Sequence, residues 1–181
     1  MNKKIIIILF FMCWNLKSYG LCIFKKNKRN VIFNIDVLIG NNFQGNKREG
    51  IPPLENYLFL IFDGQYLLKQ IAKNKENKLY LIGNVPEEWA DIYKKKLGEN
   101  INYFKNIEFS YNIGREVEDL DFYNNLNLNK KKTVLIDIDQ GRLDNVRDIG
   151  ITQTILFIKD SADNLKTNIN ILNSIGVIKT G

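Results

Sequence analysis

Histidine is absent from the 181-residue sequence, and its absence removes several kinds of catalytic site. Catalysis by Ser-His-Asp or Cys-His groups is excluded in its usual form, and so is acid–base chemistry by an imidazole. Zinc sites that need a histidine ligand are excluded as well. An enzyme with this sequence would therefore depend on carboxylates, on Lys or Arg, or on a hard metal ion.

Cysteine is scarce, and the chain contains only Cys13 and Cys22. Cys13 lies within residues 1–20, which have the layout of a secretory signal peptide. Two lysines precede an apolar run over 5–14, and small residues follow with the spacing of a cleavage site. Cleavage would remove Cys13 and leave Cys22 alone near the new N-terminus, so no intramolecular disulfide could form even in an oxidising compartment.

The apolar run over 5–14 is too short to span a bilayer comfortably. An uncleaved anchor and a buried first strand are the alternatives to a signal peptide. We expect a protein that is exported, periplasmic or secreted, with no stable membrane span after cleavage of residues 1–20.

Clustered arginines are also lacking, although the formal net charge of the whole chain is +6. Without residues 1–20 the charge falls to +3, because 23 basic residues then face 20 acidic ones. The only dense basic stretch runs from Lys25 to Arg29. We therefore expect residues 21–30 to form a basic N-terminal tail, and we expect no nucleic-acid partner.

The rest of the chain alternates apolar strands with amphipathic helices. We expect strands at 31–33, 78–82, 107–109, 133–138 and 154–158. Helices are expected after Asp63 as N-cap and over 86–97, 120–126, 143–149 and 162–175, whereas 54–61 could be helix or strand. This alternation predicts an α/β fold over residues 31–181, with a three-layer, Rossmann-like parallel sheet and no room for a large cap domain.

Polar residues follow three of the expected strands. Asn34 and Asp36 follow the first strand, Asn84 ends the second, and Asp137 and Asp139 end the fourth. Residues two apart on a strand share a face, and active sites of open parallel sheets lie beyond the carboxyl ends of the strands. Such a set suits phosphate chemistry with Mg²⁺. The alternative is that these residues only cap loops and helices.

Four segments in this order resemble the sequence motifs of the haloacid dehalogenase (HAD-like) superfamily of phosphatases and related hydrolases. Its first motif, Asp-x-Asp after a strand, matches 34–36, and its second, a strand ending in Ser/Thr-Asn, matches 79–84. Its third, a Lys before a helix, matches 114–123, and its fourth, a strand with acidic residues at its end and then a helix, matches 134–150. The resemblance covers nearly all of the expected mature chain.

The residues that depart from these motifs matter as much as those that match. The resemblance implies a nucleophilic Asp at position 34, a phosphate-binding hydroxyl at 83 and a Lys at 117, but the chain has Asn34, Gly83 and Val117. An amide is a poor nucleophile and adds no negative charge to a metal site. Arg115 is the nearest cation that could replace the Lys.

The resemblance thus implies a candidate catalytic set of Asn34, Asp36, Asn84 and Arg115. Asp36 matches the general acid/base, and a weak Mg²⁺ site would use Asp36, Asp137 and Asp139. Whether the protein is an enzyme stays open at this point.

The hypothesis that follows is a phosphatase-like protein with impaired catalysis, a pseudoenzyme that binds a phosphorylated small molecule or a protein partner. One alternative is an active hydrolase in which Asp36 activates water. The other is an unrelated non-catalytic ligand-binding domain of α/β type, for which the expected Gly-x-Gly-x-x-Gly is missing.

Overall fold

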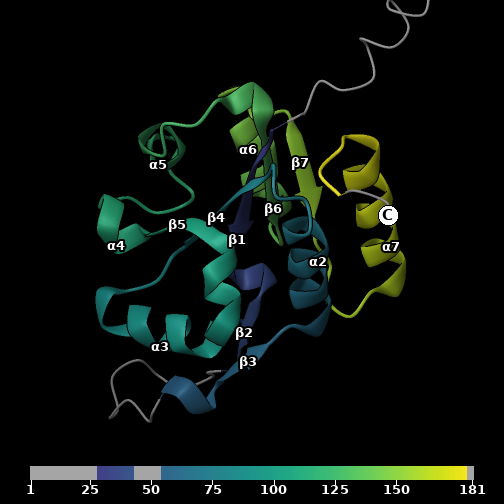
Figure 1. Ribbon diagram of the computed structural model, residues 1–181. Coiled ribbons are helices and arrows are strands. Elements are labelled where there is room, and N and C mark those ends of the chain that lie inside the picture. Colours follow the sequence, from purple (N-terminus) through teal and green to yellow (C-terminus); the bar gives the residue numbers. More distant parts are fainter. Residues whose placement is uncertain (1–27, 43–53, 179–181) are drawn as a thin grey trace, which may run out of the picture.

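A wholly parallel five-stranded sheet forms the centre of the computed structural model, which describes residues 28–42 and 54–178. The strand order is β5-β4-β1-β6-β7 (Figure 1). The bounds are β1 (Asn30–Asn34), β4 (Lys78–Gly83), β5 (Phe104–Phe109), β6 (Thr133–Asp137) and β7 (Gln153–Leu156). The fold class expected from the alternation of strands and helices is therefore confirmed.

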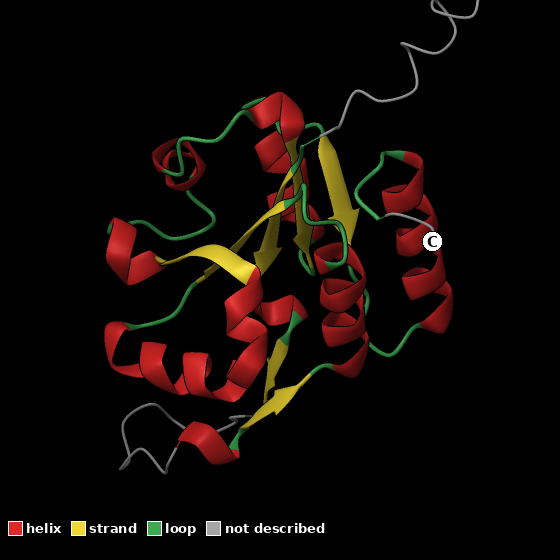
Figure 2. Ribbon diagram, in the orientation of Figure 1, coloured by secondary structure: helices red, strands yellow, loops and turns green. Residues whose placement is uncertain are grey.

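Helices cover both faces of this sheet (Figure 2). One face is covered by α2 (Phe62–Ala72), α3 (Glu87–Leu97) and α7 (Ala162–Ser174), and the other by α5 (Leu120–Asn125) and α6 (Gln140–Asp148). The one-turn helix α4 (Ser110–Ile113) follows β5. The described residues also form four 3-10 helices: η1 (Ile35–Val37), η2 (Leu54–Asn56), η3 (Gly98–Tyr103) and η4 (Lys130–Lys132).

The central strand β1 is buried on both faces. Val31 and Phe33 pack in the core beneath α2, α3 and α7, whereas Ile32 packs in the core beneath α5 and α6. All three side chains are fully buried. Consecutive side chains on a strand point to opposite faces, so an unbroken apolar run is required in this middle position.

A small antiparallel pair follows β1, formed by β2 (Ile39–Asn41) and β3 (Leu58–Leu60). The segment 54–61, which the sequence left open between helix and strand, is thus a 3-10 turn followed by a strand. Gly40 lies opposite Phe59, and a Cβ at Gly40 would overlap the Phe59 ring. Glycine at this position therefore lets the ring cross the neighbouring strand.

Three local predictions were wrong. Asp137 and Asp139 do not share a strand face, because β6 ends at Asp137 and Asp139 is the N-cap of α6. Helix α2 begins at Phe62 with Ile61 as its N-cap, and Asp63 lies in the first turn. Strand β1 ends at Asn34, so Asp36 is not on the same strand face as Asn34 but in η1. The Asn34 side chain accepts a hydrogen bond from the Asp36 backbone N–H, and this capping contact turns the chain out of the strand.

The other expected strands and helices are confirmed, with ends shifted by a few residues. No helix in the described part of the chain is long and apolar enough to cross a bilayer. The expected signal peptide, Cys13, Cys22 and most of the basic tail lie outside the described residues.

Candidate functional site

Asn34 lies at the end of β1, fully buried, with both polar atoms of its side chain in use. Its Oδ1 accepts from the backbone N–H of Asp36 at 3.1 Å. Its Nδ2 donates to Oδ2 of Asp137 at 2.9 Å. Because β1 pairs with β6, the ends of these two strands lie side by side, and the predicted proximity of Asn34 and Asp137 is observed.

Asp137 ends β6 and is the most enclosed acid of the site, with no exposed surface. Its Oδ1 accepts from the Asp139 backbone N–H at 3.0 Å and from Nη2 of Arg142 at 2.8 Å. Its Oδ2 accepts from Asn34 and from Nε of Arg142, the latter at 3.0 Å. The Arg142 contact is a bidentate charge-assisted pair, which is the arrangement that best compensates a buried carboxylate.

Arg142 belongs to the first turn of α6, and its side chain is 12% exposed. Besides Asp137, its Nη1 donates to Glu118 Oε1 at 2.7 Å, and Nη2 lies 3.8 Å from Asp36 Oδ2. Burial alone would lower the pKa of Arg142, but the hydrogen bonds and charges of Asp137 and Glu118 outweigh burial and raise it. One permanently charged guanidinium thus joins three carboxylates.

Asp36 is the half-exposed acid of the site, with 46% of its side chain accessible. Burial raises the pKa of its carboxyl, the Arg142 charge partly offsets this rise, and Asp137 adds to it. Lys159, an exposed residue after β7, also lowers the pKa. The net result is a pKa above the ordinary value for Asp, a property found in groups that exchange protons.

Asn84 follows β4 and fixes the segment that precedes α5. Its Oδ1 accepts from the Val117 backbone N–H at 2.9 Å, and its Nδ2 donates to Glu118 at 2.5 Å and to Glu116 at 3.4 Å. Burial works to raise the pKa of Glu118, but hydrogen bonds from Asn84 and Arg142 outweigh it and lower the pKa. Asn84 is therefore engaged with protein groups on both sides of its amide.

Position 117, where the resemblance implied a lysine, holds a buried apolar side chain. Val117 is 1% exposed and packs in the core with residues of α5 and α6. Arg115, the expected substitute, is half-exposed and pairs with Asp119 at 2.9 Å. The structure brings Arg142 to the strand ends instead, and neither Arg142 nor Glu118 is among the residues predicted from the sequence.

A signal for Arg142 did exist in the sequence. Asp139 caps α6, and its Oδ1 accepts from the Arg142 backbone N–H at 2.9 Å. The third residue after an N-cap lies in the first turn, and when that helix follows a strand directly, its side chain can fold back over the strand end. A helix N-cap at Asp139 therefore predicts that the Arg142 side chain lies close to Asp137.

The expected Mg²⁺ ligands do not fit a metal in this arrangement. Asp137 uses both oxygens for hydrogen bonds, and Asp139 caps a helix. Within residues 28–42 and 54–178, no group of three or more His, Cys, Asp or Glu side chains is placed to hold a metal ion. The prediction of a Mg²⁺ site on Asp36, Asp137 and Asp139 is therefore not supported by the geometry.

Gly83, where a phosphate-binding hydroxyl was implied, is crowded by a neighbouring side chain. A Cβ at Gly83 would overlap Cγ2 of Ile35 and lie 3.0 Å from its Cβ. Ile35 is 1% exposed and belongs to η1. A serine or threonine at position 83 is therefore excluded while Ile35 keeps its place.

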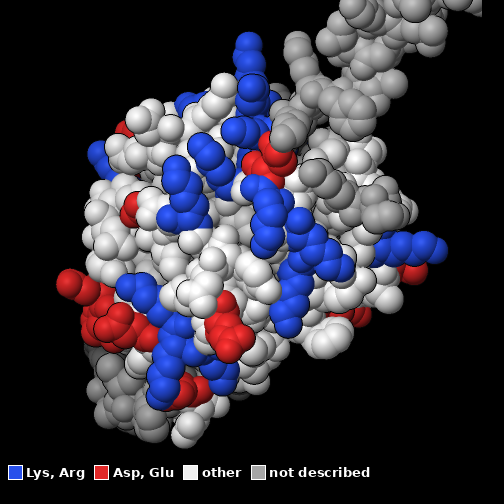
Figure 3. Space-filling view, viewed as in Figure 1, with Lys and Arg blue, Asp and Glu red and all other residues white. Residues whose placement is uncertain are grey.

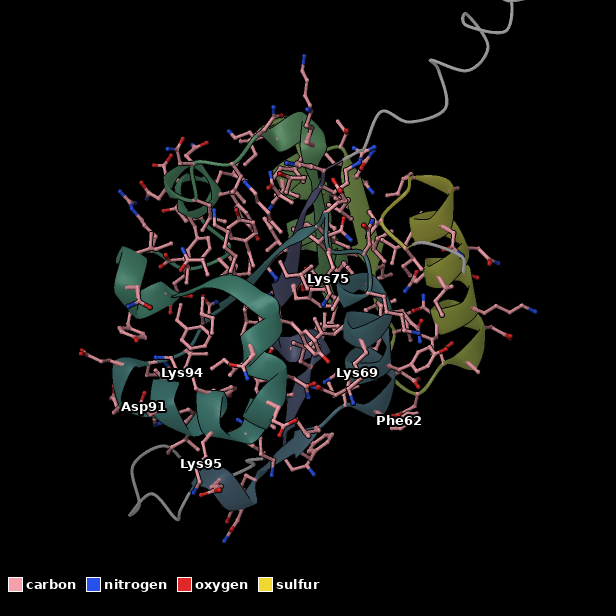
Figure 4. The ribbon with its side chains drawn as sticks, viewed as in Figure 1. Phe62, Lys69, Lys75, Asp91, Lys94 and Lys95 are labelled. Atoms are coloured by element: carbon pink, nitrogen blue, oxygen red, sulfur yellow. The ribbon has the colours of Figure 1, made fainter. Side chains whose placement is uncertain are left out.

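Basic side chains are concentrated on one face of the molecule (Figure 3). Lys and Arg gather over the middle of the face shown in Figure 3, and a group of Asp and Glu lies at its lower left. Figure 4 shows Phe62 at the start of α2 and Lys75 in the turn that follows the helix. On α3, Lys94 lies 3.6 Å from Asp91, and Lys95 pairs with Glu55 at 3.0 Å. The basic charge of α3 is thus partly neutralised.

Comparison with known proteins gives matches at the level of structure. A scan of protein-family models finds no match, and neither does a search of curated proteins. A candidate beta-phosphoglucomutase from Thermotoga maritima superimposes with a TM-score of 0.55 and 17% identity, over 81% of this chain and 99% of that one.

A HAD family hydrolase from Deinococcus radiodurans, solved with bound phosphate and sodium, gives a TM-score of 0.53 at 9% identity. That match covers 84% of this chain and 98% of the other. An uncharacterized protein from Corynebacterium glutamicum gives 0.53 at 14% identity, over 85% and 98% of the two chains. Identities this low establish the architecture alone, and the architecture agrees with the motif order in the sequence: the chain has the fold of the haloacid dehalogenase superfamily.

Proposed function

We propose that this protein is a non-catalytic binding domain with a hydrolase-like fold. The observation that carries the proposal is the state of Asn34, which stands where the resemblance implies a nucleophilic carboxylate. Its amide nitrogen faces Asp137 and its amide oxygen faces the Asp36 backbone N–H. A side chain that is neutral, buried and hydrogen-bonded at both ends cannot attack phosphorus.

The charges around the site support a protein partner over a phosphorylated small molecule. Asp36 and Glu118 are about half exposed, and Asp139 and Glu116 are exposed as well. The nearby guanidinium of Arg142 is already shared among carboxylates. An incoming phosphate would meet uncompensated negative charge, whereas a basic or hydrogen-bond-donating protein surface would be attracted.

An active hydrolase in which Asp36 activates a water molecule is the second candidate. The raised pKa of the Asp36 carboxyl, caused by burial and by Asp137 against the attraction of Arg142, favours it. The loss of both the nucleophile at 34 and the lysine at 117 counts against it. A single kinetic experiment separates the two candidates.

The test is hydrolysis of a generic aryl phosphate with Mg²⁺ by the wild type, Asn34→Asp and Asp36→Ala. We expect no turnover by the wild type above a buffer control. Turnover that Asp36→Ala abolishes would overturn the proposal in favour of the second candidate. Turnover only in Asn34→Asp would support the proposal and locate the loss of catalysis at the nucleophile position.

A separate binding experiment tests whether the site prefers a protein partner to a phosphorylated ligand. Titration of the wild type with inorganic phosphate, followed by calorimetry and by the thermal midpoint Tm, should give no saturable signal. Saturable binding that is weakened by Arg142→Ala would show that the site accepts phosphate and would redirect the search to phosphorylated ligands.

A further inference from the structure

We infer that Arg142 is the resident cation of this site, so that its guanidinium takes the place of a divalent metal and no metal binds at the strand ends of the wild type. The inference goes beyond the proposed function, because it concerns how the buried charge of Asp137 is neutralised. It would stand even if the domain proved to hydrolyse a substrate without a metal.

The first support is the complete use of the Asp137 carboxylate. An ionised carboxylate offers about four lone-pair sites. Asp137 accepts four hydrogen bonds, from Asn34 Nδ2, the Asp139 backbone N–H, Arg142 Nε and Arg142 Nη2. No lone pair remains for a metal, and a divalent ion close to Arg142 would be repelled by it.

The second support is the way in which Arg142 is held. Its backbone N–H is bound by the cap residue Asp139, and its guanidinium by Asp137 and Glu118. The planar fork of an arginine matches this bidentate geometry, which a lysine would not reproduce. The backbone and the guanidinium of Arg142 are both held by hydrogen bonds, and its side chain is almost buried. A surface arginine that contacts one acid lacks these constraints.

The third support is the amide at position 34. A carboxylate there would lie beside the buried carboxylate of Asp137 and would add a second negative charge for a cation to neutralise. The amide instead donates to Oδ2 of Asp137 at 2.9 Å. Asn34 and Arg142 therefore act together: the amide adds no charge, and one monovalent cation balances Asp137, the one fully buried acid among the described residues.

The experiment compares Arg142→Ala with Arg147→Ala, which removes a half-exposed arginine from the same helix. Thermal unfolding is recorded in EDTA and in millimolar Mg²⁺, and Mg²⁺ is titrated into the wild type by calorimetry. We expect Arg142→Ala to lose roughly 10 °C in Tm, because a buried charge loses its partner. Arg147→Ala should lose no more than a few degrees, since its ion pair with Asp144 is exposed. The wild type should show no Mg²⁺-dependent shift and no saturable heat.

A second pair of variants keeps the test decisive if Arg142→Ala does not fold. Combining Arg142→Ala with Asp137→Asn removes the orphaned charge and should restore folding and recover most of the lost Tm. The inference is overturned if the double variant is no better than Arg142→Ala, or if Arg142→Ala loses no more than Arg147→Ala. It is equally overturned if the wild type binds Mg²⁺ saturably and Asp137→Asn abolishes that binding. None of these readouts depends on hydrolysis, so this inference and the proposed function can fail separately.

Discussion

At the scale of single residues, Asn34 connects sequence and site most directly. It ends the central strand, caps η1 and donates to the one acid of the site that has no contact with solvent. An aspartate would keep the shape of this side chain but would replace a donor with a charged acceptor. The same position therefore decides both the chemistry of the site and the electrostatic cost of the fold.

We expect Asn34→Asp to destabilise the protein by about 2–4 kcal/mol near neutral pH. The physical reason is that a buried donor is lost and two carboxylates are placed side by side. Urea unfolding measures the difference, and Asn30→Asp at the other end of β1 is the matched control. Asn30 is partly exposed and donates to Thr133 at 3.4 Å, so its variant should change stability far less. Equal losses in both variants would contradict the special role of position 34.

Removing the side-chain hydroxyl of Tyr123 is expected to have the opposite effect on stability. It is 2% exposed, and its hydroxyl finds no hydrogen-bond partner among the described residues. Burial, with the nearby charge of Asp137, raises the pKa of Tyr123, so the hydroxyl stays neutral. We expect Tyr123→Phe to leave stability unchanged or to raise it by up to about 1 kcal/mol, because an unsatisfied polar group is removed.

The control for Tyr123 is another buried tyrosine that does have a partner. Tyr93 is 7% exposed and shares a side-chain hydrogen bond with Asn41. Tyr93→Phe should lose about 1 kcal/mol in the same unfolding assay. If Tyr123→Phe lost as much as Tyr93→Phe, its hydroxyl would have to be bonded in solution.

At the scale of elements, the contact between the end of β4 and η1 explains why position 83 carries no side chain, where the resemblance implied a hydroxyl. Gly83 ends β4, and Ile35 of η1 fills the space that a Cβ would need. We expect Gly83→Ala to cost about 1–3 kcal/mol through overpacking. Ile35→Ala alone should cost about 2–5 kcal/mol, since it leaves a cavity in the core.

The two changes should compensate each other in part, because Ile35→Ala removes the atom that a Cβ at position 83 would overlap. A double-mutant cycle on urea midpoints measures this coupling. The loss in the double variant should be smaller than the two single losses combined. Strict additivity would show that the β4 end relaxes away from η1 and that crowding by Ile35 does not exclude a side chain at position 83.

Elements were predictable where one local rule decided the outcome. The apolar run of β1 and the Pro86 and Gly98 boundaries of α3 are of this kind, and the structure has them. The site was predictable only as far as the strand ends, which gave Asn34, Asp36, Asn84 and Asp137. A cap at Asp139 is the only local signal that points to Arg142. Glu118 comes from a loop whose position is set by tertiary packing, and sequence proximity alone does not bring Arg115 to the site.

At the scale of the whole molecule, the strand order sets which charges meet. With β1 between β4 and β6, the segments after three strands converge, and Arg142 reaches them from the start of α6. Two carboxyl groups that face Arg142 then respond to pH in opposite ways. Glu118 has a lowered pKa, because hydrogen bonds from Asn84 and Arg142 outweigh burial. Asp36 has a raised pKa, because burial and repulsion by Asp137 and Glu118 outweigh Arg142 and Lys159.

These directions fix the sign of each contribution to the free energy of unfolding. The folded state favours ionised Glu118, so its stabilisation is present above the ordinary carboxyl pKa and is lost as pH falls through the lowered value. The folded state favours protonated Asp36, so its stabilisation is present below the ordinary value and is lost as pH rises through the raised one. Near pH 7 the fold therefore gains from the charge of Glu118 and loses from the charge of Asp36.

We expect Glu118→Gln to be less stable than the wild type at about pH 7 and Asp36→Asn to be more stable. Both differences should shrink as the pH falls below the pKa values of the two carboxyls, because both groups then become neutral in the folded and unfolded states. Urea midpoints recorded from neutral to acidic pH measure this. A less stable Asp36→Asn at neutral pH would mean that attraction to Arg142, 3.8 Å away, outweighs burial. A more stable variant would identify Asp36 as an acid that the fold retains at a cost, which is the behaviour of a residue kept for function, in binding or in catalysis.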